Sequence, residues 1–166
     1  MSEKSTVFDQ TIKHKGYFNF SDLYNFCFGF LKDSNYNVAE KEYAEKDTPI
    51  GKEIKISWEA GKKISDYFKN VIEVKWQILG LNEAEIERDG RKEKTNKGEI
   101  KISFTATIVS DYEDRWQSTP TYKFMRSIYD KYIIRTTKEQ YEDKLAEKTD
   151  SFVQQVKAFL ELQGRK

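Results

Sequence analysis

Apolar and polar residues alternate through much of segment 51–110, and this pattern limits the fold more than any other feature of the sequence. The alternation is clearest over residues 54–58, 72–78 and 100–108, where large apolar side chains occupy most even-numbered positions. A period of two places one set of side chains in a core and the other in water, as in a half-buried β-strand. The segment is therefore predicted to form an antiparallel β-meander with one apolar face.

Turn-forming residues are predicted to reverse the chain within this meander. Asp89-Gly90 is a favoured pair for a two-residue type I′ turn, whose central positions both require positive φ. The flanking residues 84–88 and 91–95 would then form a polar hairpin that projects from the sheet. The segment 96–98, Asn-Lys-Gly, is predicted to make the next reversal.

Helical periodicity replaces the alternation on both sides of the meander. Apolar residues recur every three or four positions over about residues 20–32, with Asn19 or Ser21 as the N-cap. The same spacing predicts two C-terminal helices, over residues 119–133 and 136–164.

Two further strands complete the predicted order of elements. One covers about residues 7–20, and the other, rich in Lys and Glu over residues 36–45, is predicted to lie at an edge of the sheet. Strands followed by helices favour a single α+β domain over residues 1–166, with one N-terminal and two C-terminal helices packed on one sheet face. This order resembles helix-grip folds, in which a curved sheet wraps a long C-terminal helix. The resemblance implies a ligand cavity between that helix and the sheet.

Composition excludes several classes of protein. The 29 Lys and Arg residues nearly balance 28 Asp and Glu residues, so a net charge of +1 provides no long-range attraction for nucleic acid or an anionic membrane. The single cysteine, Cys27, cannot form an internal disulfide or a multi-cysteine metal site. The N-terminal residues do not resemble a signal peptide, and no apolar run is long enough to span a membrane. A soluble cytoplasmic protein is predicted.

Residues suited to catalysis or cofactor binding do not form a recognisable pattern. The only histidine, His14, lies between two lysines, and Cys27 falls on the apolar face of the first predicted helix. The glycines do not match either of the two common nucleotide-binding loops. The sequence therefore predicts a non-enzymatic protein without a metal or cofactor.

Aromatic residues are the first group of candidate binding residues. The first helix carries more of them than a sheet on one side can cover, so at least one of Tyr24, Phe26 and Phe28 is predicted to face a partner, a ligand or the far side of a curved sheet. The alternative is that the C-terminal helices cover them. The interface or ligand candidates are Phe20, Tyr24, Phe26, Phe28, Trp58, Trp76 and Phe104.

Basic residues around the predicted hairpin are the second group. A projecting basic hairpin suits a phosphate backbone, but five positive and four negative residues over 87–99 leave this segment with a charge of only +1. It also lacks an aromatic residue that could stack on a base. The nucleic-acid candidates are Arg88, Arg91, Lys92, Lys94 and Lys97.

Three functional hypotheses follow from these patterns. The first is a binding or assembly protein that uses the first helix or a sheet edge to contact a protein partner or another copy of itself. The second is a carrier or enzyme that holds a small apolar ligand in a helix-grip-type cavity. The third is an RNA- or ribosome-associated protein that uses the basic hairpin.

Overall fold

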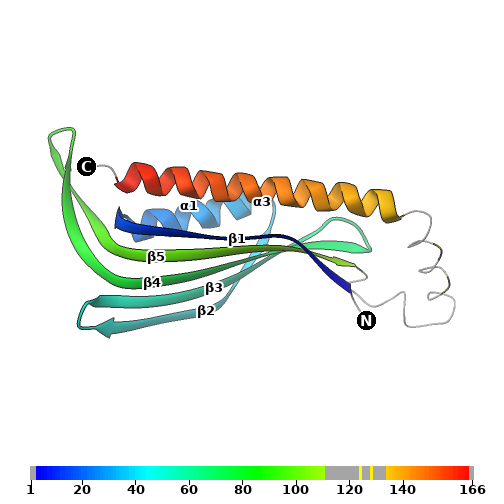
Figure 1. The fold of residues 1–166 in the computed structure, drawn as a ribbon, viewed down its shortest axis with the longest axis horizontal. Coiled ribbons are helices and arrows are strands. Elements are labelled where there is room, and N and C mark those ends of the chain that lie inside the picture. Colours follow the sequence, from blue (N-terminus) through cyan, green and yellow to red (C-terminus); the bar gives the residue numbers. More distant parts are fainter. Residues whose placement is uncertain (1–2, 111–123, 125–127, 129–133, 165–166) are drawn as a thin grey trace.

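The computed structural model describes residues 3–110, 124, 128 and 134–164. Strands and helices follow one another in the order that the sequence predicts for this part of the chain (Figure 1). The elements are β1 (Glu3–Phe18), α1 (Phe20–Asp33), β2 (Asn37–Thr48), β3 (Gly51–Lys63), β4 (Phe68–Arg88), β5 (Arg91–Ser110) and α3 (Ile134–Gly164).

The strands form one five-stranded antiparallel sheet in the order β1-β5-β4-β3-β2. Strands β2, β3 and β4 each pair with the next strand along the chain, which confirms the predicted meander. Strand β1 returns to pair with β5, so β1 and β2 are the two edges. The prediction that the Lys- and Glu-rich strand lies at an edge is also confirmed, and its charges oppose pairing with another chain.

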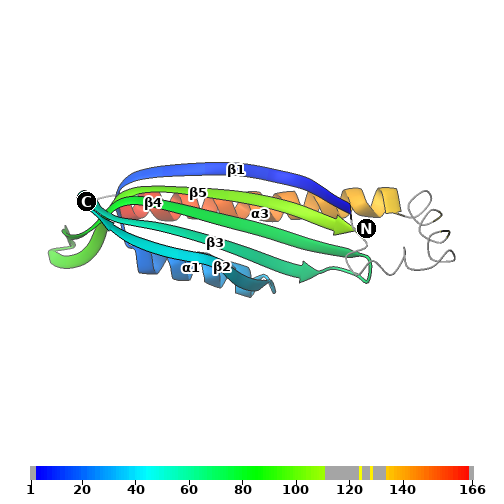
Figure 2. The same cartoon turned by 90° about the horizontal axis from the view of Figure 1, so that it is seen from below.

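Both described helices lie on one face of the sheet. Figure 2 shows α3 running along β1 and β5, while α1 lies beside it toward β2. The predicted α+β fold is therefore confirmed. The helix predicted over residues 119–133 lies outside the described residues, apart from Phe124 and Ile128, which are helical and exposed.

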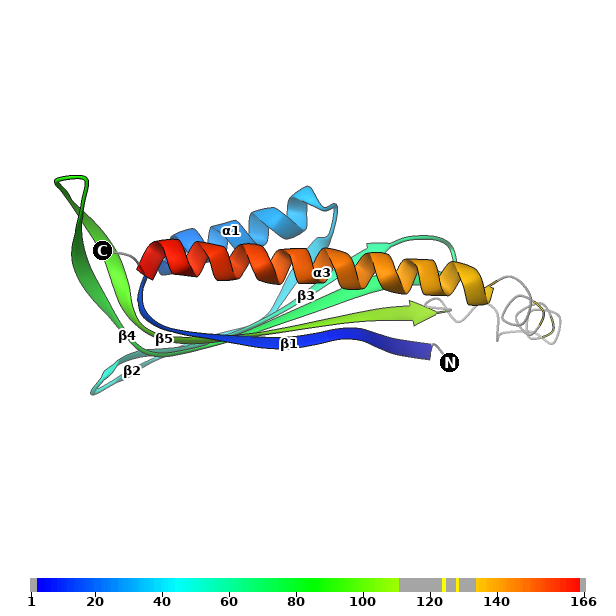
Figure 3. The same ribbon diagram turned by 45° about the horizontal axis from the view of Figure 1, so that its top comes forward.

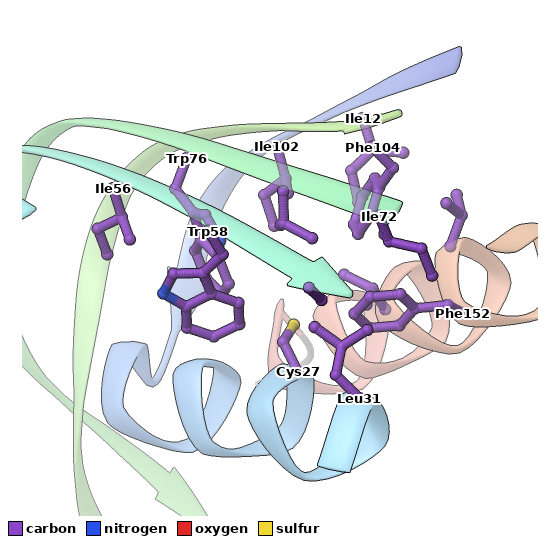
Figure 4. Packing of buried hydrophobic residues seen from close by; sticks show 14 of the residues in the cluster. Ile12, Cys27, Leu31, Ile56, Trp58, Ile72, Trp76, Ile102, Phe104 and Phe152 are labelled. Atoms are coloured by element: carbon purple, nitrogen blue, oxygen red, sulfur yellow. The ribbon is translucent and has the colours of Figure 1, made fainter. Parts of the chain in front are cut away.

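The helix-facing side of the sheet forms the core, as the alternation predicts. Strand register places Ile56 opposite Trp76 and Trp76 opposite Ile102, so apolar rows cross the sheet from strand to strand. Figure 4 shows this layer facing Cys27 and Leu31 of α1 and Phe152 of α3. The predicted core residues are all buried: Ile54, Ile56, Trp58, Val74, Trp76, Ile102, Phe104 and Ile108.

Capping interactions fix both ends of α1. The Asn19 side chain accepts a hydrogen bond from the backbone N–H of Asp22 at 3.0 Å, which confirms Asn19 as the N-cap. At the other end Asn35 adopts a left-handed conformation, with φ of 66°. The N–H of Tyr36 then reaches the carbonyl of Leu31, and the pattern is a Schellman motif that ends the helix.

The predicted hairpin is confirmed, but the second predicted reversal is wrong. Asp89 and Gly90 both have positive φ, 51° and 76°, and join β4 to β5. Residues 96–98 do not reverse the chain, because they continue β5 and pair with β1 and β4.

Gly98 lies opposite Gly16, and a Cβ on Gly98 would lie 3.1 Å from the carbonyl oxygen of Gly80. Strands can approach this closely only where side chains are absent, so the glycines mark a bend in the sheet.

Beyond this bend the β4–β5 hairpin rises toward the C-terminal end of α3 (Figure 3). Arg88 donates hydrogen bonds to the carbonyl oxygens of Leu162 and Gln163, at 3.1 and 3.0 Å. These carbonyls lie in the last turn of the helix, where a guanidinium group satisfies both the free acceptors and the negative end of the dipole. The hairpin thus holds the end of α3.

Candidate ligand-binding site

Aromatic side chains from one side of α1 meet the two core tryptophans. Tyr24 packs edge-on against Trp58, with 4.9 Å between ring centroids, and Phe20 lies 6.4 Å from Trp76. Phe28 contacts Trp58 at 6.1 Å but keeps 37% of its surface exposed. The structure therefore brings five of the predicted aromatic candidates into one cluster.

The aromatic residues on the other side of α1 pack against α3 instead. Phe26 stacks on Phe159 with 4.9 Å between centroids, and Phe30 stacks on Phe152 at 4.4 Å. Phe104, predicted as a ligand candidate, is fully buried beneath Phe152. The sheet and α3 together cover most of the apolar side chains that surround α1. The two ring stacks lie between α1 and α3, and the Phe104–Phe152 contact lies between the sheet and α3.

A single carboxylate links α1 to the edge of the sheet. Glu40 of β2 accepts hydrogen bonds at one oxygen from the Tyr24 hydroxyl, at 2.9 Å, and from the Trp58 indole N–H, at 3.3 Å. Burial raises the pKa of Tyr24 to about 12, and the hydrogen bond to Glu40 and its negative charge act in the same direction. Tyr24 is therefore a neutral donor at physiological pH.

This arrangement predicts that Tyr24 ionises late in an alkaline titration. Absorbance of the folded protein at 295 nm should include a component with a midpoint near 12, and the Tyr24→Phe variant should lack that component. Because the folded-state pKa is raised, its contribution to stability is present below the ordinary pKa and is lost as the pH rises through the folded value. The Glu40→Gln variant should lower the midpoint. An unchanged titration in both variants would contradict the assignment.

An open cleft lies next to this cluster, between the start of α1 and strands β2, β3 and β4. Its volume is about 570 Å³, within the range of small-molecule sites. Phe20, Tyr43, Ile54 and Leu81 supply its apolar surface. Tyr43 is 46% exposed, so its ring offers a face that no described residue covers completely.

Hydrogen bonds from side chains to the backbone hold the polar rim of the cleft. Asn96 accepts from the N–H of Phe20 at 3.0 Å, which fixes the start of α1 against β5. Asn82 donates to the carbonyls of Ile50 and Gly80, at 2.9 and 3.2 Å, which fixes β4 against the β2–β3 turn. The rim is therefore already ordered before any ligand binds.

The charges around the cleft are mainly negative. Glu45, Asp47 and Glu83 contribute three carboxylates, against the single ammonium group of Lys52. Lys52 pairs with Glu45 at 2.7 Å, and this hydrogen-bonded pair raises the pKa of Lys52. Asp47 and Glu83 have no ion-pair partner among the described residues, so the cleft retains an excess of negative charge.

The basic residues of the hairpin lie elsewhere, and most have a structural neighbour. Arg88 caps α3, and Lys97 lies over the Tyr17 ring at 5.3 Å. Lys92 and Lys94 lie opposite Glu87 and Glu85 in the β4–β5 register, and Arg91 is exposed beside the turn. Cross-strand partners of opposite charge reduce the net field of the hairpin.

Sequence analysis alone missed the cleft. Its lining comes from the first turn of α1, the β2–β3 turn and the bend in β4, which are far apart in the sequence. Tyr43 lies within segment 36–45, for which the sequence predicts only an edge strand. The best indication of the cleft in the sequence is the group of asparagines beside glycines, because asparagine side chains commonly form hydrogen bonds with irregular backbone.

Comparison with known proteins gives no significant match to a family model, a curated protein or a solved structure. Among the described residues, no helix has the length and apolar character needed to cross a membrane. Function is therefore inferred from the chemistry of the cleft.

Proposed function

We propose that this chain is a binding protein that holds a small organic cation with an apolar body in the cleft beside α1. The observation that carries the proposal is the combination of an apolar wall with an excess of carboxylates around one cleft of about 570 Å³. Ligand sites are typically apolar concavities in which a few polar groups determine orientation.

Each part of such a ligand has a counterpart in the cleft. An aryl or alkyl body would lie against Tyr43 and Leu81, and burying it would provide most of the binding energy. An ammonium group would lie toward Asp47 and Glu83, whose charges the single ammonium group of Lys52 offsets only in part. A cation over the exposed face of Tyr43 gains further from the ring quadrupole.

Assembly through α1, the first hypothesis from the sequence, has less support because Phe26 stacks on α3 and Tyr24 contacts Trp58. It stays a prediction, and Phe28 is the residue of α1 best exposed to serve it. A cavity between α3 and the sheet has less support where Phe152 of α3 packs against Phe104 of β5.

Two compounds of similar size and opposite charge test the proposal. Phenethylamine should shift the NMR resonances of Tyr43, Leu81 and their neighbours in a saturable way, whereas 3-phenylpropionate should not. The Glu83→Gln variant should weaken phenethylamine binding by about three- to tenfold, because a partly desolvated charge pair contributes about 1 kcal/mol. Tyr43→Ala should weaken it at least as much through lost apolar contact.

Glu87→Gln is the matched control, because it removes one carboxylate from the hairpin without changing the cleft. Its affinity for phenethylamine should equal that of the unmodified protein. Equal binding of the amine and the carboxylate, or an equal loss in Glu83→Gln and Glu87→Gln, would contradict the proposal.

A further inference from the structure

The sheet face opposite the helices carries a cluster of lysines in a single region. In Figure 2 this face is turned toward the viewer, and no described helix covers it. Lys55, Gln77, Lys101 and Lys13 lie opposite one another in register across β3, β4, β5 and β1. Lys75 occupies the next row, between Ser57 and Ser103. We name Lys13, Lys55, Lys75 and Lys101 the lysine cluster.

The ammonium groups of the lysine cluster form no ion pair among the described residues, although the carboxylates of Glu42 and Glu99 line the same part of the surface. No carboxylate oxygen of the described residues lies within ion-pairing distance of any of its four ammonium groups. Lys13 and Lys101 are direct cross-strand neighbours, an arrangement of like charges that destabilises a sheet. Most charged strand faces avoid this cost by placing opposite charges across from each other. A bound anion would offset this repulsion.

The surface at the lysine cluster is concave. Two adjoining hollows of about 450 and 390 Å³ share Gln77 and Lys101. Ser57 and Ser103 line the second hollow and add hydroxyl donors between the lysines. Ammonium and hydroxyl groups together are suitable donors for phosphate oxygens.

Neighbouring rows limit the size of the anion. Glu59 and Glu73 lie opposite each other in the row beyond Lys75, and Asp9 lies in the same row on β1. On the other side Glu99 pairs with Lys15 at 3.3 Å. With strands about 4.8 Å apart and residues about 3.4 Å apart along a strand, the cluster covers about 14 by 7 Å. An extended anionic surface would meet the carboxylates of all these rows, whereas a compact anion can lie between the lysines, away from Glu42 and Glu99 at the margins.

We propose that the lysine cluster is a binding site for a compact, soluble anion with several phosphate groups, distinct from the cleft beside α1. The phosphates would lie between the lysines across β1, β5, β4 and β3. Gln77, Ser57 and Ser103 would donate hydrogen bonds to the phosphate oxygens that the lysines leave free. The bound anion would remove the repulsion between Lys13 and Lys101, so binding and stability are coupled.

Inorganic tripolyphosphate is the probe, titrated into the full chain by calorimetry at low salt and mapped by NMR. The unmodified protein should bind it with shifts centred on Gln77 and Lys101, and added salt should weaken the affinity. The double variant Lys13→Gln/Lys101→Gln should lose at least about tenfold in affinity, since two charge-assisted contacts are removed. Its melting temperature without ligand should be unchanged or higher, because a like-charge pair is gone.

Lys144→Gln/Lys157→Gln, on α3, is the matched control with the same change in net charge, and it should keep full affinity. Lys75→Gln should also weaken tripolyphosphate binding, although it removes no cross-strand pair of like charges. This variant tests the proposal if the double variant folds poorly. An absence of tripolyphosphate binding, an equal loss in the α3 control, or tighter binding to an oligonucleotide or to phosphatidylserine vesicles would overturn the proposal.

Discussion

Replacing Trp76 with alanine is expected to lower the free energy of unfolding by about 3–5 kcal/mol, the usual cost of truncating a large aromatic residue in a core. Trp76 is 2% exposed and contacts Trp58, Phe20 and Tyr24, with ring centroids 5.3, 6.4 and 6.2 Å away. The cavity would lie in the middle of the sheet, where backbone pairing on both sides of β4 prevents collapse. Urea unfolding followed by fluorescence or circular dichroism measures the loss.

Trp76→Phe is the matched control, because the buried indole N–H of Trp76 has no hydrogen-bond acceptor among the described residues. Phenylalanine keeps most of the apolar contact and removes a donor whose burial costs about 1–3 kcal/mol. We expect this variant to lose less than half as much stability as Trp76→Ala. A loss under about 1 kcal/mol in Trp76→Ala would show that the tryptophan does not support the core.

Gly51→Ala is expected to cost about 2–4 kcal/mol, although it adds only a methyl group. Gly51 has φ of 133°, a conformation that residues with a Cβ rarely adopt. The added Cβ would also lie 2.7 Å from the carbonyl carbon of Gly80 and 2.9 Å from the carbonyl oxygen of Leu81. Both contacts are with backbone atoms, so the steric overlap can be relieved only if strands β3 and β4 separate at the bend.

Gly29→Ala is expected to increase the stability of the protein, whereas Gly51→Ala decreases it. Gly29 lies within α1, and a Cβ there would meet no atom within 4 Å. Alanine in a helix interior is more stable than glycine by about 0.5–1 kcal/mol. Thermal unfolding of the two variants side by side provides the comparison, and a similar shift in both would contradict the close packing at Gly51.

The regular part of the sheet could be predicted from the sequence because each local pattern agrees with the tertiary structure. Alternation over residues 54–58 and 72–78 identified the buried face, and the register pairs Ile56 with Trp76 as that face requires. Asp89-Gly90 located the hairpin for the same reason, since its positive φ values are a local requirement.

The bend and the cleft could not be predicted, because both depend on contacts between distant residues. Gly98 resembles a turn residue in the sequence, yet its role comes from the neighbouring backbone of Gly80. The charges of Asp47 and Glu83 are ordinary surface charges until the bend brings them to one cleft. The lysine cluster depends equally on register, since Lys13 and Lys101 are far apart in the sequence and become neighbours only when β1 pairs with β5.

The pairing of β1 with β5 also determines the order in which the chain can fold during synthesis. Thr11 and Ser103, whose hydroxyl groups lie 3.1 Å apart across these strands, are 92 residues apart in the sequence. At about 5–20 residues per second, β1 leaves the ribosome about 5–20 s before its partner strand exists. Strands β3, β4 and β5 can each pair with the strand made just before them, whereas β1 stays unpaired until β5, the last strand, has been made. We therefore expect β1 and α3 to join a meander that has already formed.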